Sequence, residues 1–335
     1  MTADNLAYTL NDPSRRTMFA GAAAVSMLTL MAQDNAEAAE GRDSRASAAT
    51  TKVAVDHNTA PNRFVDVNGV RYAYRRFGKA GGKPPILLLH HYIGTMDWWD
   101  PALNDGLAAS REVILFDNRG VGLSSDKTPN RIDPMADDTH AFIHGLGLDR
   151  VDLLAYSLGG MVGQELAMRY PDDVRNLILV GTGPRGGVGM AEPKPHVVKA
   201  LTEAAPDFKR ARPYLFFSQT DNGKAAAAAF TARTAERKED LDPASSMQTM
   251  QAHNEALAEF GDPASRDAYT SRLRRLTKPT LVVNGNNDIM VDTINSYEMS
   301  QVIPTAQLII YPDAGHGALF QYAPLFVKHV NLFLD

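Results

Sequence analysis

From residue 63 onward, short apolar runs alternate with segments of helical periodicity, and this alternation constrains the fold more than any other feature. Short apolar runs bounded by Gly, Pro or Asp are typical of strands that are buried on both faces of a parallel sheet. Their alternation with helices predicts an α/β fold with a mostly parallel central sheet flanked by helices. The six apolar runs lie at residues 85–89, 113–116, 151–155, 177–180, 281–283 and 308–310.

Turn and cap signals mark the ends of several elements. Asn68 and Gly69 lie between two strand-like segments, which predicts a β-hairpin. Asp133 is followed by proline, and this pair predicts a helix start because aspartate caps a helix and proline is tolerated in its first turn. Helices are predicted to start at residue 133 and to cover residues 159–170 and 324–333. The α/β core is assigned to residues 63–183 and 277–335.

Residues 184–276 interrupt the alternation of strands and helices. They contain no convincing strand, and Asp242 and Asp262, each followed by proline, mark two helix starts. A helical insertion between two strands of a parallel sheet predicts a cap over the sheet edge where ligands bind in α/β folds. The alternative is a packed appendage that has no role in substrate binding.

The N-terminal segment has the features of a targeting sequence. Arg15 and Arg16 precede an Ala-rich apolar stretch, and Ala-Glu-Ala at residues 36–38 offers a small-residue cleavage site. This order resembles a bacterial twin-arginine export signal and predicts a periplasmic or extracellular protein with a signal over residues 1–39. The alternative is a disordered tail. Residues 40–62 lack apolar periodicity and are predicted to form a flexible linker.

Composition excludes several classes of function. The formal net charge is −5 and no long basic run is present, so a nucleic-acid-binding surface is not expected. The absence of cysteine excludes disulfides, thiolate nucleophiles and cysteine metal ligands. No phosphate loop or convincing metal-ligand spacing is seen, and the N-terminal apolar run is too short to span a membrane. We therefore expect a small-molecule substrate, no cofactor and no metal, and the sequence indicates no oligomeric state.

A serine stands between a predicted strand and a predicted helix. Ser157 lies in the sequence AYSLGG, where small neighbours permit a sharp strand-to-helix turn that exposes the hydroxyl. An ordinary tight turn is the alternative. Because a serine hydroxyl is a poor nucleophile without a base, an acid and a histidine are expected further along the chain. Asp288 and His316 each follow an apolar run in the expected order, and Asp292 and Asp313 are alternative acids.

From about residue 63 to the C-terminus, the chain resembles the α/β-hydrolases, and it is most similar to small serine esterases and cofactor-free haloperoxidase-like enzymes. The motifs that carry the resemblance lie at residues 87–90, 117–124, 156–160, 285–288 and 315–316. The resemblance implies a Ser157, Asp288 and His316 triad, with the backbone N–H groups of Tyr92 and Leu158 as oxyanion donors. The family motif has glycine after the histidine at 90, whereas this chain has His91.

The resemblance predicts the reaction better than the substrate. The leading hypothesis is hydrolysis of an apolar carboxylic ester through an acyl-enzyme. Carbon–carbon bond hydrolysis or perhydrolysis by the same triad is an alternative, and a non-catalytic ligand-binding homologue is a third. The motif at 117–124 is interpreted as structural, because its polar side chains can satisfy buried backbone groups. The residues expected to line a substrate pocket are His91, Trp98, Trp99, Phe216 and Phe217.

Overall fold

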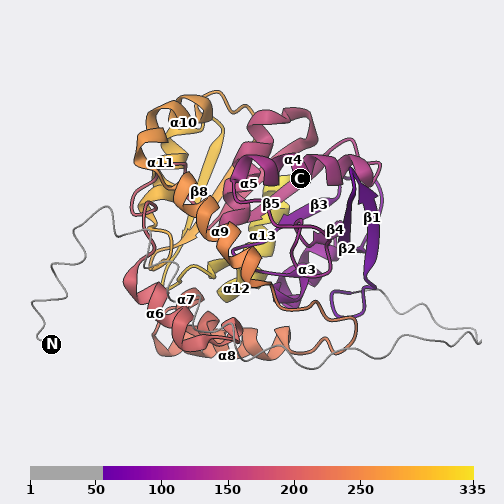
Figure 1. Cartoon of the computed structure of the whole chain (residues 1–335), viewed down its shortest axis with the longest axis horizontal. Helices are drawn as coiled ribbons and strands as arrows, with labels where there is room; N and C mark the ends of the chain where they lie inside the picture. The colour runs from indigo at the N-terminus through magenta and orange to yellow at the C-terminus, as the bar shows by residue number, and fades with distance from the viewer. Residues whose placement is uncertain (1–55) are drawn as a thin grey trace, which may run out of the picture. The chain divides into compact units, whose positions relative to one another are not determined.

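The computed structural model describes residues 56–335, so the predicted export signal and most of the predicted linker lie outside the described residues. Within the described part, eight strands form one sheet in the order β1-β2-β4-β3-β5-β6-β7-β8 (Figure 1). The strands are β1 (Arg63–Val67), β2 (Val70–Gly78), β3 (Ile86–Leu89), β4 (Glu112–Phe116), β5 (Val151–Tyr156), β6 (Val174–Val180), β7 (Thr280–Gly285) and β8 (Ala306–Tyr311).

The sheet is parallel from β4 to β8, and only β2 runs against this direction, because it pairs antiparallel with both β1 and β4. All residues of β3, β5 and β7 are buried, as the continuous apolar runs predict for strands covered on both faces. The predicted α/β fold with a mostly parallel sheet is therefore confirmed, and each of the six apolar runs forms one parallel strand.

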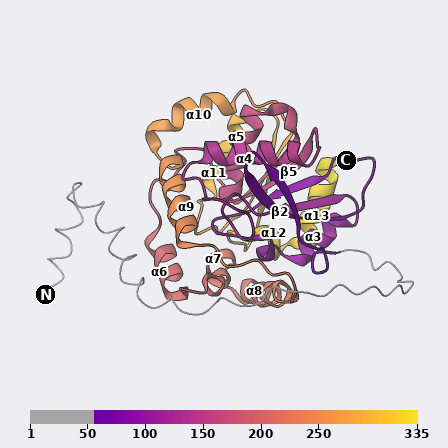
Figure 2. The ribbon, with the colours of Figure 1, turned by 45° about the vertical axis from the view of Figure 1, so that its right-hand side comes forward.

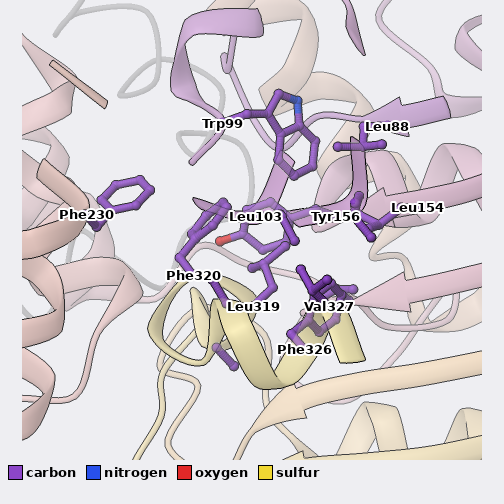
Figure 3. Close-up of a cluster of buried hydrophobic side chains, with 14 of the residues drawn as sticks. Leu88, Trp99, Leu103, Leu154, Tyr156, Phe230, Leu319, Phe320, Phe326 and Val327 are labelled. Carbon is purple, nitrogen blue, oxygen red and sulfur yellow. The ribbon is translucent and has the colours of Figure 1, made fainter. Parts of the chain in front are cut away.

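Helices cover both faces of the sheet, and successive strand residues pack against opposite layers. Leu87 and Leu153 pack with α4 and α5 on one face, whereas Leu88 and Leu154 pack with α3 and α13 on the other (Figure 3). The first layer consists of α4 (Ile132–Gly145), α5 (Leu158–Arg169) and α11 (Ile294–Val302). The second consists of α3 (Pro101–Ala108), α12 (Ala318–Gln321) and α13 (Ala323–Leu334).

Every regular element between β6 and β7 is helical. Figures 1 and 2 show α6, α7 and α8 grouped at one end of the core. Phe230 of α8 stacks on Phe320 of α12 with ring centroids 4.8 Å apart, and Arg233 donates to both oxygens of Asp100 at 2.7 Å. These contacts join the insertion to the core. Its helices are α6 (Pro195–Ala204), α7 (Arg212–Phe216), α8 (Asp221–Thr234), α9 (Met247–Phe260) and α10 (Arg266–Leu273).

The last residues of the predicted linker belong to the packed part of the chain, which corrects the boundary at residue 62. Ala60 is fully buried, and the His57 N–H donates to Asp105 Oδ1 at 2.8 Å. The His57 carbonyl accepts from Arg237 of the insertion at 3.2 Å. Polar contacts of this kind leave no apolar periodicity in the sequence. The predicted end of the flexible linker, at residue 62, therefore lies too far toward the C-terminus.

A buried arginine connects the sheet to the insertion. Arg75 of β2 is fully buried, and its Nη1 donates to Asp97 at 2.6 Å while its Nη2 lies 3.4 Å from Asp242. Burial raises the pKa of Asp242 to about 6, which reflects the cost of holding this carboxylate away from water.

We expect Arg75→Leu to lower the free energy of unfolding by roughly 3–5 kcal/mol, because buried Asp242 loses its ion-pair partner and buried Asp97 keeps only Arg237, at 3.7 Å. The neighbouring Arg76 pairs with Glu112 at 2.7 Å where both side chains are partly exposed, so Arg76→Leu should cost only about 0–1 kcal/mol. Urea unfolding of both variants measures the difference. Equal losses would contradict the role assigned to Arg75.

Candidate active site

Ser157 lies at the turn between β5 and α5. Its backbone has φ 56° and ψ −118°, a left-handed conformation that is strained for a residue other than glycine. Its N–H donates to the Val180 carbonyl of the neighbouring strand at 2.9 Å, which holds the turn against the sheet. A Cβ at Gly159 would lie 2.5 Å from the Leu89 carbonyl oxygen, so the close approach of helix and strand requires glycine there. The turn therefore places the hydroxyl at the N-terminus of α5.

His316 joins this hydroxyl to a carboxylate. Its Nε2 lies 2.9 Å from Ser157 Oγ, and its Nδ1 lies 2.8 Å from Asp288 Oδ2. The second oxygen of Asp288 accepts from the backbone N–H groups of Met290 at 2.8 Å and Val291 at 3.0 Å. These bonds orient the carboxylate. It accepts the Nδ1–H of His316, and this tautomer leaves the lone pair of Nε2 facing the serine hydroxyl.

Two adjacent strands bring the acid and the histidine together. Asp288 follows β7 and His316 follows β8, and these strands pair in parallel, so both loops leave the same edge of the sheet. Backbone bonds from Asn286 N–H to the Tyr311 carbonyl (3.0 Å) and from Asn287 N–H to the Ala314 carbonyl (2.9 Å) join the loops.

The two alternative acids have other partners. Asp292 pairs with Lys194 of the insertion at 2.6 Å. Asp313 accepts from the hydroxyl of Thr220 at 2.9 Å and from Asn222 at 3.1 Å. Neither carboxylate contacts His316, so Asp288 is the acid that the geometry favours.

The loop after β3 carries the first predicted oxyanion donor. The Gly94 N–H donates to the His91 carbonyl at 3.1 Å, which closes a turn with Tyr92 and Ile93 at its centre. The amides of Tyr92 and Leu158 donate to no acceptor in the described part of the chain. Backbone amides without an acceptor are the groups that can stabilise a developing oxyanion, which is the role predicted for these two.

The motif at 117–124 is hydrogen-bonded to the end of this loop. Asp117 accepts from the Met96 N–H at 2.9 Å and from the Leu123 N–H at 3.1 Å. Ser124 Oγ donates to the Asp117 carbonyl at 2.7 Å and accepts from the Ala73 N–H at 2.9 Å. The polar side chains satisfy buried backbone groups, as expected for a structural motif.

The two histidines at 90 and 91 have no acid partner. His91 Nδ1 donates to the Tyr92 carbonyl at 2.8 Å, and His90 Nδ1 accepts the N–H of His91 at 2.8 Å. Burial lowers the pKa of both imidazoles well below the ordinary value, so both are neutral at pH 7. Because neither ring contacts Ser157, His316 is the only described histidine placed to act as its base.

The predicted pocket residues separate into two groups. His91 lies between Trp98 (ring centroids 5.3 Å apart) and Phe216 (5.1 Å), and Phe216 lies 5.8 Å from His316. Trp99 instead is fully buried with Tyr156 and Phe320 in the core (Figure 3), and Phe217 packs on Phe230. Neither Trp99 nor Phe217 makes a ring contact with His91 or His316 in the described part of the chain, and their place in the pocket stays a prediction.

A cavity of about 430 Å³ lies away from these aromatic residues. It is lined by the loop at 127–130 and by residues of α9, with Arg119 and Glu255 among the polar groups. No predicted pocket residue contributes to it.

Sequence reasoning missed two residues near the site. Tyr156 directly precedes the serine, and its ring centroid lies 5.1 Å from that of His316. His253 of α9 contacts the loop after β3, where its Nδ1 accepts the Ile93 N–H at 3.1 Å. The position of Tyr156 beside Ser157 was a usable signal, whereas nothing in the sequence relates His253 to a loop so far from it.

We expect His91→Gly to retain substantial activity and to accept larger acyl groups. The substitution removes a ring between Trp98 and Phe216, yet it leaves the chain from Ser157 to Asp288 intact. Relative kcat/KM values over a series of ester chain lengths measure this shift. His316→Ala is the inactive control. A His91→Gly variant that folds and binds substrate, yet is as inactive as His316→Ala, would contradict the assignment of His316 as the base and of His91 as a residue of the pocket wall.

Residues 84–322 match the family model described as the alpha/beta hydrolase fold, and the chain belongs to this family of hydrolases. An alpha/beta hydrolase fold protein from Chitinophaga pinensis is 38% identical with a TM-score of 0.77, over 84% of this chain and 99% of that chain. The enol-lactonase from Burkholderia xenovorans LB400 is 22% identical with a TM-score of 0.66, over 81% of this chain and 99% of that chain, and shares the fold.

A curated relative gives a more specific comparison. The 2-hydroxy-6-oxononadienedioate/2-hydroxy-6-oxononatrienedioate hydrolase of Klebsiella pneumoniae is 28% identical over 288 residues, which are 82% of this chain and 96% of the relative. Among residues 56–335, no helix has both the length and the apolar character needed to cross a bilayer.

Proposed function

We propose that the protein is a serine hydrolase that cleaves carboxylic esters through an acyl-enzyme. The observation that carries the proposal is the hydrogen-bonded series from Ser157 Oγ through His316 to Asp288, with distances of 2.9 and 2.8 Å. This arrangement supplies a nucleophile, a base and an orienting acid, which together are what acyl transfer needs.

In the proposed reaction, Ser157 Oγ attacks the ester carbonyl carbon while His316 Nε2 takes its proton. Asp288 stabilises the imidazolium that forms. The N–H groups of Leu158 and Tyr92 donate to the oxyanion of the tetrahedral intermediate. His316 then returns the proton to the leaving alcohol, and a water molecule activated by the same imidazole hydrolyses the acyl-enzyme.

Carbon–carbon bond hydrolysis is the second candidate, and the Klebsiella pneumoniae relative favours it. The compound in that relative's name is a hydroxy-oxo diacid without an ester linkage, so its hydrolysis breaks a carbon–carbon bond. The same triad supports perhydrolysis when peroxide replaces water. A ligand-binding homologue without turnover is the least favoured alternative.

Rates on three substrate types separate these reactions. We expect purified protein to hydrolyse aryl acetates faster than β-diketones, and faster than it forms peracid from acetate and peroxide. His316→Ala serves as the control for background hydrolysis. Faster cleavage of the β-diketones would replace ester hydrolysis with carbon–carbon hydrolysis, and no turnover of any substrate would contradict both.

We also propose that residues 1–39 direct export through a twin-arginine route, with cleavage near Ala38. The support is the order of Arg15, Arg16, the Ala-rich stretch and the small-residue site. Replacing both arginines with lysine should leave full-length protein in the cytoplasm, as measured by immunoblots of cell fractions. Arg42→Lys with Arg45→Lys is the matched control. Export and processing of the Arg15, Arg16 double variant would contradict the proposal.

A further inference from the structure

The turn that presents the Tyr92 amide is strained at its next residue. Ile93 has φ 50°, although a turn with positive φ at this place ordinarily has glycine or asparagine there. A β-branched side chain makes this conformation especially costly. Such a conformation persists only where surrounding contacts hold it.

Contacts from the insertion hold both polar groups of Ile93. The Ile93 N–H donates to His253 Nδ1 of α9 at 3.1 Å, and the Ile93 carbonyl accepts from Ser245 Oγ at 2.8 Å. The Tyr92 carbonyl, in the same peptide unit as the Ile93 N–H, accepts from His91 Nδ1 at 2.8 Å. Imidazoles therefore contact both ends of this peptide unit, and the one that contacts the Ile93 N–H comes from the insertion.

A second set of bonds joins the insertion to the end of the same loop. The Asp242 N–H donates to Asp97 Oδ2 at 2.6 Å, and the Asp97 N–H donates to Asp242 Oδ2 at 3.1 Å. Arg75 lies buried against both carboxylates. The segment from Asp242 to His253 thus contacts the loop at both of its ends.

We propose that His253 and Ser245 are positioning residues, which hold Ile93 in its strained conformation and so direct the Tyr92 N–H toward the oxyanion. This inference rests on the proposed function. It makes the insertion part of the catalytic apparatus, because loss of its contacts frees Ile93 to return to negative φ and turns the amide away. His253 is buried and neutral, since burial lowers its pKa to about 4, and Nδ1 can therefore accept a hydrogen bond at pH 7.

A matched pair of substitutions tests the role of His253. Leucine removes the acceptor, whereas asparagine can place its oxygen near the position of Nδ1. With p-nitrophenyl acetate, we expect His253→Leu to lower kcat by about tenfold to a hundredfold with little change in KM, and His253→Asn to restore much of it. Affinity for phenylboronic acid, whose serine adduct is tetrahedral, should fall with kcat across the same variants.

Three controls make the outcome decisive. A fluorophosphonate that fails to label Ser157 in the wild-type protein counts against the proposed function itself. If Ser157 is labelled but a folded His253→Leu keeps wild-type kcat and boronate affinity, the positioning role alone is overturned. Equal losses in the leucine and asparagine variants would also overturn it. If His253→Leu does not fold, Ser245→Ala replaces it in the same measurements, with a smaller loss of kcat expected.

A separate group of side chains lies between α4 and the turn before β6. His140 and His144 are four residues apart, so their side chains lie on one face of α4. His140 Nδ1 lies 2.6 Å from Asp173 Oδ2, and His144 Nε2 lies 3.0 Å from Asp173 Oδ1. The ligand atoms of all three residues lie within 4.8 Å of one another.

The surroundings of the group suit a metal ion. His140 stacks on Tyr170 with ring centroids 3.9 Å apart, which fixes its orientation. Asp173 is buried, while the two imidazoles are partly exposed and leave coordination positions open to water. Two imidazole nitrogens and one carboxylate oxygen are donors that Zn²⁺, Ni²⁺ and Cu²⁺ accept.

We infer that His140, His144 and Asp173 bind a divalent transition metal ion. No spacing in the sequence indicates this group, because Asp173 follows His144 by 29 residues and only the fold brings them together. The ion would connect α4 to the turn after α5 and replace the hydrogen bonds from the imidazoles to the carboxylate.

Titration of untagged, chelator-treated full-length protein with ZnCl2 and NiCl2 tests the site by calorimetry and by Tm. We expect one ion per chain and a saturating rise in Tm, both lost in His144→Ala and in Asp173→Asn. His196→Ala, which changes an exposed histidine on α6, should bind as the wild type does. Absence of saturable binding, or binding unchanged by His144→Ala, would overturn the inference.

Discussion

Ser157→Ala should lower ester turnover by about a million-fold while the protein stays folded. Only the hydroxyl group is removed, and it is the group that donates a hydrogen bond to His316 Nε2. Without it no acyl-enzyme can form, and the remaining amides of Leu158 and Tyr92 supply only the residual rate enhancement that an oxyanion site gives alone. Initial rates on an aryl ester, measured beside the unfolding transition, separate a chemical effect from a loss of structure.

The residual rate of the Ser157→Ala sample needs its own control. A trace of contaminating esterase would show its own KM and would be inhibited by a fluorophosphonate. Residual turnover by the Ser157→Ala protein itself would not be inhibited, because the variant has no nucleophilic serine for the reagent to label. Turnover within tenfold of the wild type in such a controlled sample would show that Ser157 is not the nucleophile.

Asp288→Asn should lower kcat by roughly ten-thousand-fold. An amide in place of the carboxylate can donate to His316 Nδ1, which favours the tautomer whose Nε2 carries a proton and cannot accept one from Ser157. The backbone amides of Met290 and Val291 keep the side chain in place, so the geometry should change little.

The two other acids near the loops provide matched controls for Asp288. Asp292→Asn weakens a contact with Lys194, and Asp313→Asn weakens contacts with Thr220 and Asn222. Both variants should keep kcat within a few fold of the wild type. A ten-thousand-fold loss in either, with Asp288→Asn active, would assign the orienting acid to a different residue.

The sheet could be predicted from the sequence because its strands are short apolar runs that are buried on both faces, a local property of the chain. The hairpin at Asn68 and Gly69 and the helix starting near Asp133 were predicted from local signals in the same way, and the structure has both. The short helices α3, α11 and α12 were not predicted, because four to nine residues carry little periodicity.

The candidate site was predictable where its residues directly follow strands. Ser157, Asp288 and His316 each leave a parallel strand at the same edge of the sheet, and the structure brings them within hydrogen-bond distance. The aromatic residues were less predictable, since only the packed structure shows that Trp99 faces Tyr156 in the core while Trp98 faces His91.

Contacts across large sequence separations lay beyond any local pattern. His253 contacts Ile93 although 160 residues separate them, and the contact depends on where the insertion packs. The contact of Asp173 with His140 and His144 likewise follows from the position of α4 beside the end of α5. Such pairs are set by tertiary structure, so no spacing in the sequence reveals them.

The acyl-enzyme can be detected directly by quenching the reaction with p-nitrophenyl acetate in acid within milliseconds and measuring the mass of the protein and its peptides. We expect an added acetyl group on the peptide that contains Ser157, a burst of nitrophenolate of about one equivalent, and neither signal in Ser157→Ala. Steady turnover without an acyl adduct, or an adduct on a residue other than Ser157, would contradict the proposed mechanism.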